Sequence, residues 1–132
     1  MQPQVLIDNE FITLRYLPDE KIVHHTIHKP IDYNTLGAAM ELGLKVLQEN
    51  GASKWLSDDR LNGPVVMEDT EINRDWGKRM VAAGWRYWAN IVPEEIVAAD
   101  SLVPIIETFY EIGLRMMVFT NADDALAWLK SV

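Results

Sequence analysis

The 132-residue chain contains no cysteine, and it is poor in positive charge: 12 lysines and arginines stand against 20 aspartates and glutamates, a net charge of −8. The absence of cysteine excludes disulfides, thiolate metal sites and cysteine nucleophiles, and it suits a reducing cytoplasm. The acidic balance argues against nucleic acid or an anionic membrane as the partner, because both bind cationic surfaces. Excess acid keeps a domain soluble, and a basic protein partner is the alternative that the charge leaves open.

Long apolar runs are also missing. No apolar stretch approaches the ~20 residues that span a bilayer, and Met1 to Gln4 lack the basic and apolar segments of a signal peptide. We therefore expect a cytoplasmic protein with no membrane partner. The length suits a single domain over residues 1–132, which can bury roughly two thirds of its unfolded surface.

The rest of the sequence alternates strand-like and helix-like segments. Alternating β-branched residues predict an antiparallel hairpin of Phe11–Leu17 and Lys21–His28, with a turn at Pro18. This alternation of strands and helices predicts an α/β domain, a mostly parallel sheet of four or five strands with the hairpin at its N-terminal side and about four flanking helices. Periodicity and end signals place these elements as follows: helix 33–48, strand 54–57, helix from 69 or 70 to 83, strand 85–92, helical turn 94–99, helix 102–112, strand 115–120 and helix 122–129.

Local signals refine the helices. Residues of the N-capping type precede three of them, namely Asp32, Ser101, and Thr120 or Asn121. Gly37 and Gly43 lie inside the first long helix, where each costs ~1 kcal/mol against alanine. We expect these small residues to let the helix lie close on the sheet.

Three histidines, His24, His25 and His28, lie within five residues and suggest a metal site. On a strand His24 and His25 point to opposite faces. His24 and His28 share a face but lie about 13 Å apart at ~3.3 Å per residue, too far for one ion with ~2 Å bonds. We therefore predict no metal ion and no cofactor, with His24 and His28 on a solvated or partly covered face and His25 near the edge of the core.

The segment from Lys54 to Ser57 has the pattern of a buried interior strand, and two carboxylates and a guanidinium follow it. In an open α/β sheet, ligand and partner sites lie beyond the carboxyl ends of the strands. The apolar residues of the following loop either fold back on the core or form an exposed lip over the site. The candidate binding surface comprises Asp58, Asp59, Arg60, Val65, Val66, Met67 and Thr70.

Catalytic patterns are not visible. No serine has a Gly-x-Ser-x-Gly context, no glycine loop of the phosphate-binding type occurs, and a receiver-like Mg²⁺ pocket would lack its lysine. Asp59 and Arg60 are better explained as groups that cap the loop or pair with a neighbour. An enzyme using them would need a pocket that holds both and a perturbed carboxylate. We therefore expect no catalytic residue and no enzyme.

Five tryptophans are many for this length: Trp55, Trp76, Trp85, Trp88 and Trp128. Most fall in strands or on helical stripes, where they are expected in the core. Trp85, Tyr87 and Trp88 cannot all point the same way, so we expect one of them to reach the surface and anchor a partner.

The chain carries a set of landmarks: Lys54-Trp55-Leu56-Ser57-Asp58-Asp59-Arg60, Trp76, Ala83-Gly84, Ile91-Val92-Pro93 and Asp124-Ala125-Leu126-Ala127-Trp128-Leu129. Together they resemble the small bacterial STAS-like, or SpoIIAA-like, domains related to anti-sigma-factor antagonists. The resemblance covers nearly the whole chain and implies a four- or five-stranded sheet with flanking helices and a protein-binding, regulatory role. The signalling members carry a phosphorylated serine in an Asp-Ser-Ser-Gly-type turn, but residues 59–70 contain no Ser-Gly pair. Thr70 is the only hydroxyl there, and its acidic neighbours would repel a phosphate.

Two functions from different classes remain. The first is a non-catalytic regulatory or protein-interaction domain that binds a protein partner or forms a homodimer. The alternative is a carrier of a small apolar ligand or lipid, with walls formed by Met40, Trp76, Met80 and Met116.

Overall fold

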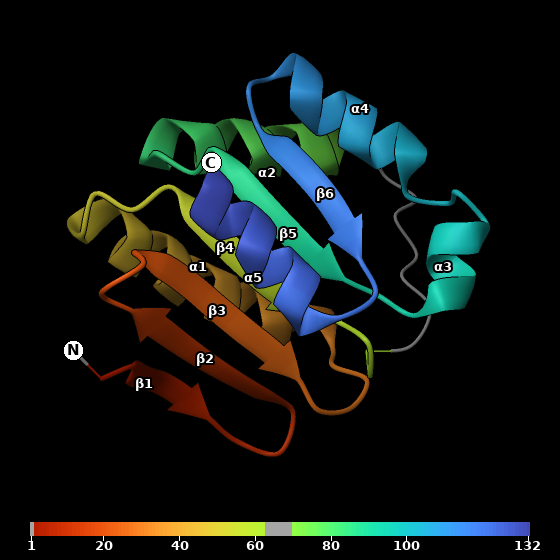
Figure 1. Ribbon diagram of the computed structural model, residues 1–132. Helices are drawn as coiled ribbons and strands as arrows, with labels where there is room; N and C mark the ends of the chain where they lie inside the picture. Colours follow the sequence, from red (N-terminus) through yellow and green to blue (C-terminus); the bar gives the residue numbers. More distant parts are fainter. Residues whose placement is uncertain (1, 63–69) are drawn as a thin grey trace.

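One mixed sheet organises the chain (Figure 1). The computed structural model describes residues 2–62 and 70–132, in which there are six strands and five helices. In chain order these are β1 (Gln4–Asp8), β2 (Ile12–Leu17), β3 (Ile22–Ile27), α1 (Tyr33–Glu49), β4 (Lys54–Asp58), α2 (Thr70–Ala83), β5 (Tyr87–Ile91), α3 (Glu94–Ala98), α4 (Val103–Glu111), β6 (Arg115–Phe119) and α5 (Ala122–Ser131).

The strands follow one another across the sheet in sequence order. β1, β2 and β3 are antiparallel, whereas β3, β4, β5 and β6 are parallel. The predicted α/β class, the hairpin and the mostly parallel order are confirmed. The expected strand number of four or five is too low, because Gln4–Asp8 pairs with β2 as a sixth strand.

Helices cover the two faces of the sheet unequally. In Figure 1, α5 crosses in front of β4 and β5, while α1 and α2 lie behind the sheet. α5 packs on β4, β5 and β6, and α4 packs on β6 and α2. The count of five helices exceeds the expected four because residues 94–98 form a short helix of their own. None of the helices in the described ranges combines the length and the hydropathy needed to cross a bilayer.

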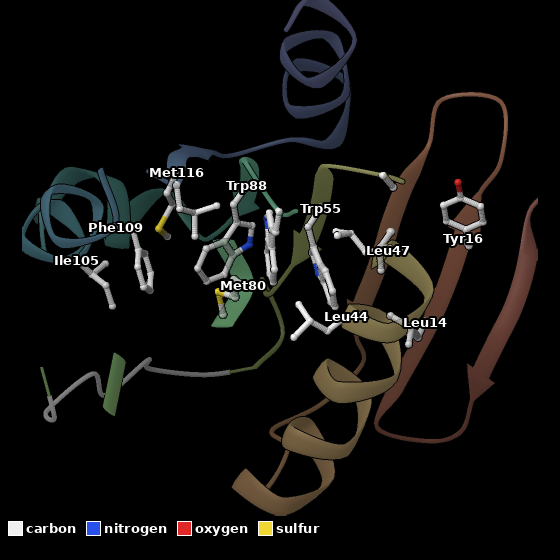
Figure 2. Close-up of a cluster of buried hydrophobic side chains, with 14 of the residues drawn as sticks. Leu14, Tyr16, Leu44, Leu47, Trp55, Met80, Trp88, Ile105, Phe109 and Met116 are labelled. Carbon is white, nitrogen blue, oxygen red and sulfur yellow. The ribbon is translucent and has the colours of Figure 1, made fainter. Parts of the chain in front are cut away.

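The larger core cluster lies on the face covered by α1, α2 and α4, and it contains a row of stacked aromatic rings (Figure 2). The rings of Trp55 and Trp85 are stacked with centroids 4.4 Å apart, and Trp88 meets Trp85 edge-on at 5.3 Å. Tyr87 points to the opposite face and contacts Trp128 of α5. Trp85 and Trp88 are buried, whereas Tyr87 is only partly buried, so Tyr87 is the residue of the three that reaches the surface in part. Its expected role as an anchor for a partner stays a prediction.

α1 lies close on this tryptophan row at one of its two glycines. A Cβ atom at Gly43 would overlap the ring of Trp55, whereas a Cβ at Gly37 would meet nothing within 4 Å. Close approach therefore explains Gly43 but not Gly37.

Two of the three predicted N-caps are confirmed. Asp32 accepts from the backbone N–H of Thr35 at 2.8 Å, and Asn121 accepts from that of Asp124 at 2.9 Å. The prediction for Ser101 is wrong. α4 begins after Leu102 with no side-chain cap, and the Ser101 hydroxyl instead donates to the Ile96 carbonyl at 3.5 Å.

Candidate functional site

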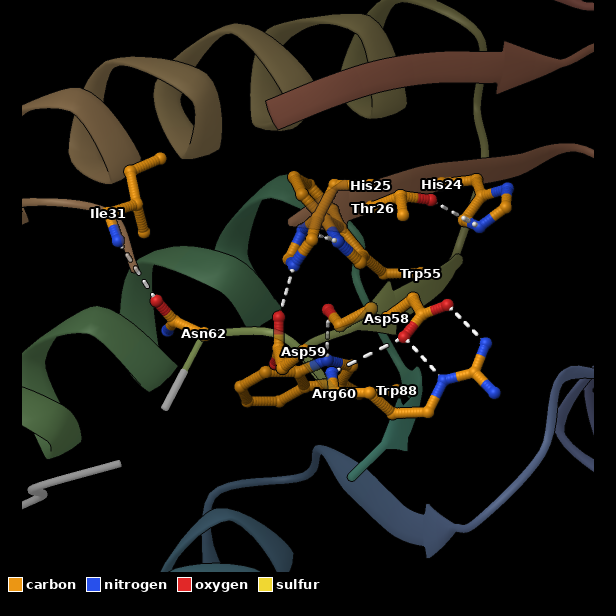
Figure 3. A network of polar contacts seen from close by, with 11 residues as sticks. His24, His25, Thr26, Ile31, Trp55, Asp58, Asp59, Arg60, Asn62 and Trp88 are labelled. Atoms are coloured by element: carbon orange, nitrogen blue, oxygen red, sulfur yellow. Dashed lines mark hydrogen bonds and ion pairs between the residues drawn. The ribbon is translucent and has the colours of Figure 1, made fainter. Parts of the chain in front are cut away.

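The candidate site lies where β4 ends between β3 and β5 (Figure 3). Side chains along β4 alternate, so Trp55 and Ser57 face the α1 and α2 side of the sheet, while Leu56 and Asp58 face the α5 side. The interior position that the sequence predicted for this strand is confirmed. Its last residues therefore place polar groups on both faces of one sheet edge.

Asp58 and Arg60 form a bidentate ion pair on the α5 side. The Arg60 guanidinium donates to the two carboxylate oxygens at 2.9 and 2.7 Å, and the Arg60 backbone N–H adds a bond of 3.3 Å. Burial opposes the charge of Asp58, but these bonds from Arg60 outweigh it and hold the pKa of the carboxyl below its usual range. The ion pair that we expected to order this loop therefore exists, and Asp58 is the carboxylate in it.

Asp59 points the other way, toward His25 of β3. Its Oδ1 lies 2.8 Å from Nε2 of His25, and Nδ1 of the same ring accepts the indole N–H of Trp55 at 3.0 Å. Because Nδ1 accepts, the ring proton is on Nε2, where it donates to Asp59. Both nitrogens of His25 are thus engaged, which makes it a structural histidine at the edge of the core, as expected.

Ser57 and Asn90 extend this polar layer onto β5. The two residues are register partners, and Ser57 in turn is the register partner of His25. The indole of Trp88 donates to the Ser57 hydroxyl at 2.8 Å, whereas Oδ1 of Asn90 is buried without a hydrogen-bond partner. Sequence reasoning did not select His25, Ser57 or Asn90 as site residues. The sequence pattern that could have identified them is a polar residue at an inward-facing position of an otherwise apolar strand.

The chain after β4 turns tightly, and we call residues Asp58–Asn62 the β4 turn. Its closing residue, Asn62, donates its backbone N–H to the Asp59 carbonyl at 3.1 Å and accepts the backbone N–H of Ile31 at 3.2 Å. Leu61 projects from the turn with 61% of its surface exposed. Beside it is an open depression of about 360 Å³, lined by Thr26, Ile27, Asp58, Arg60 and Leu61.

The structure thus brings together three of the seven predicted binding residues. Asp58, Asp59 and Arg60 lie at the predicted edge, although they divide between its two faces. Thr70 is the first residue of α2. The Thr70 side chain and the residues Val65, Val66 and Met67 lie outside the part that the structure describes, so the choice between an apolar lip and a core contact stays a prediction.

The histidines are separated as the strand geometry predicts. His24 lies partly buried on the α5 side, and burial, with further effects of His25 and Arg15, lowers its pKa to about 4 against the opposing effect of Asp58. His28 is exposed at the end of the hairpin, with Nε2 2.7 Å from the Thr13 hydroxyl. The described side chains include no group of three or more acidic or histidine residues arranged to hold a metal ion.

No family model, curated protein or solved structure matches this chain. The chemistry of the site therefore follows from its geometry alone. That geometry fixes a turn and orders the polar groups beneath it.

Proposed function

We propose that this is a non-catalytic, regulatory protein-interaction domain of the bacterial cytoplasm, which binds a protein partner or a second copy of itself through the β4 turn. The observation that carries the proposal is Leu61, which is 61% exposed although the residues on both sides of it are held in place. A partner that covers Leu61 would bury its exposed apolar surface, which favours association, and the turn that carries it is already ordered.

Hydrogen bonds fix the turn before any partner arrives. Arg60 is tied to Asp58, Asp59 is tied to His25, and Asn62 is tied to the Ile31 backbone. A surface that is already ordered loses little conformational entropy when it binds. The depression next to Leu61 can receive a complementary side chain of the partner.

The engagement of the polar groups favours binding over acid–base chemistry. Both nitrogens of His25 and both carboxylate oxygens of Asp58 already have partners. Asp58 also keeps a pKa below its usual range, so its carboxylate is a weak base at neutral pH. The enzyme alternative required one pocket for Asp59 and Arg60, but these side chains lie on opposite faces of the sheet edge.

The STAS-like assignment is part of this proposal and is supported by the resemblance of the sequence and by the α/β architecture. The carrier alternative depends on walls around a cavity. Met80 and Met116 are instead buried in the main core, and Met40 and Trp76 pack against it. We therefore carry only the interaction function further.

The test replaces Leu61 with aspartate. Leu61→Asp should abolish homodimerisation measured by light scattering during gel filtration, or retention of a protein partner in quantitative affinity purification, because a charge replaces the apolar anchor. Val5→Asp is the matched control, since Val5 is 58% exposed and lies on the edge strand β1. The control should associate like the wild type.

The proposal fails if the purified wild-type domain is monomeric and retains no protein partner. It fails equally if a retained partner binds the Leu61→Asp variant as well as it binds the wild type. It also fails if Leu61→Asp and Val5→Asp reduce association equally. Circular dichroism of each variant distinguishes a lost interface from a lost fold.

A further inference from the structure

A row of buried polar side chains crosses three neighbouring parallel strands just below their carboxyl ends. His25 on β3, Ser57 on β4 and Asn90 on β5 are successive register partners, and they are 3%, 0% and 6% exposed. The row beneath it consists of Val23, Trp55, Trp88 and Met116. The polar row is therefore a built layer that rests on the tryptophan core.

The lower row supplies hydrogen-bond donors in a regular diagonal pattern. Trp55 on β4 donates to His25 on β3 at 3.0 Å, and Trp88 on β5 donates to Ser57 on β4 at 2.8 Å. The equivalent residue for Asn90 is Met116 on β6, whose thioether has no proton to donate. The pattern thus stops one strand short, and this explains why Oδ1 of Asn90 has no partner.

An orphaned carbonyl at this depth is costly. A buried acceptor left without a donor costs about 1–3 kcal/mol, and native proteins keep such groups chiefly where something else satisfies them. Within the described residues, Asn90 Oδ1 is the one buried side-chain oxygen or nitrogen without a partner. It lies at the carboxyl end of a parallel strand, where ligands of α/β sheets bind.

Asp59 provides a second acceptor on the same face and at the same edge. It lies two residues beyond Ser57, the register partner of Asn90, and its Oδ1 is held by His25. No described residue donates to its Oδ2, and the side chain is 12% exposed. The two acceptors, one of them charged, call for a cationic group with several N–H donors.

We propose that Asn90 and Asp59 form a binding site for a guanidinium or ammonium group, which donates to Asn90 Oδ1 and Asp59 Oδ2. The net charge of −8 favours the approach of such a cation. The group belongs either to an arginine or lysine side chain of another protein or to a free small molecule. This inference is independent of the interaction proposed for Leu61, because it depends on a different face of the β4 turn.

The experiment is an NMR titration of the full ¹⁵N-labelled chain with methylguanidinium chloride. We expect saturable shifts of the Asn90 side-chain amide and of the Trp88 indole N–H, which donates to Ser57 in the polar row. Tetramethylammonium chloride is the matched control ligand, because it has the same charge and no N–H donor. Tetramethylammonium chloride should shift these signals no more than sodium chloride does.

Two variants assign the effect to the site. Asn90→Leu should bind methylguanidinium about tenfold more weakly, the loss of one good hydrogen bond, and Asp59→Asn should weaken binding at least as much. The amide oxygen that Asp59→Asn introduces can still accept from His25, so the layer beneath remains intact. Leu61→Ser should bind the probe like the wild type, which separates this result from the test of the interaction surface.

Titrations with acetyl-arginine-methylamide and with free arginine distinguish a side chain from a free small molecule, since the blocked form imitates an arginine within a protein. The proposal is overturned if tetramethylammonium produces the same shifts, or if the Asn90 amide does not move on saturation. Binding of equal strength to Asn90→Leu also overturns it. If that variant does not fold, intermolecular NOEs between the probe and the wild-type Asn90 amide decide, and their absence refutes the site.

Discussion

The indole N–H of Trp55 donates to Nδ1 of His25 at 3.0 Å, and the two rings meet edge to face with centroids 6.0 Å apart. This bond places the histidine proton on Nε2, and that proton in turn holds Asp59. A core tryptophan thus sets the orientation of a carboxylate at the sheet edge. The same residue that stabilises the core also shapes the surface that we propose to be functional.

Replacing Trp55 with phenylalanine tests this relationship. The change leaves Nδ1 of His25 buried without a donor and removes ring volume from the core, so the free energy of unfolding should fall by roughly 2–4 kcal/mol. Urea denaturation measures the loss. Trp128→Phe is the control, because Trp128 is only partly buried and makes ring contacts with Tyr87 and Phe119. An equal loss in both variants would show that the hydrogen bond to His25 contributes nothing.

The two glycines of α1 should respond in opposite ways to alanine. Gly43→Ala drives a methyl group into the Trp55 ring and should destabilise the domain by about 1–3 kcal/mol, the usual cost of overpacking. Gly37→Ala meets open space and should stabilise it by up to about 1 kcal/mol, the difference in helix propensity. Thermal unfolding of the two variants measures both effects. Stabilisation by Gly43→Ala would contradict the close packing of α1 on the sheet.

Acid should destabilise the domain through His24. Its pKa is about 4 in the folded chain, below the ~6.5 of an unfolded histidine. As the pH falls from about 7 to about 5, the unfolded chain therefore takes up the proton first. The free energy of unfolding should decrease by up to about 2 kcal/mol over this window. Urea denaturation at the two pH values measures the decrease.

The matched variants for this window are His24→Gln and Arg15→Gln. The first removes the titrating ring and should flatten the loss between about pH 7 and about pH 5. The second removes one charge that lowers the pKa of His24 and should reduce the loss in part. An unchanged pH dependence in His24→Gln would assign the acid sensitivity to other groups.

Much of the fold could be predicted because its signals are local. The strand from Lys54 and the helix from Tyr33 appear where apolar spacing and the Asp32 cap place them. The N-cap prediction for Ser101 is wrong because its hydroxyl donates to the Ile96 carbonyl, which leaves the N-terminus of α4 without a side-chain cap. Val5 and its neighbours form a strand only because β2 offers an edge for pairing, which no local pattern reveals.

The sequence by itself determined the α/β class, the hairpin, the central strand and the position of Asp58, Asp59 and Arg60 at its end. Only the tertiary structure decided what those groups contact. It paired Arg60 with Asp58, turned Asp59 toward His25 and left Asn90 without a donor beside Met116. The physical reason is that periodicity and capping act between near neighbours in the chain. Hydrogen bonds across strands depend on a register that exists only once the sheet has assembled.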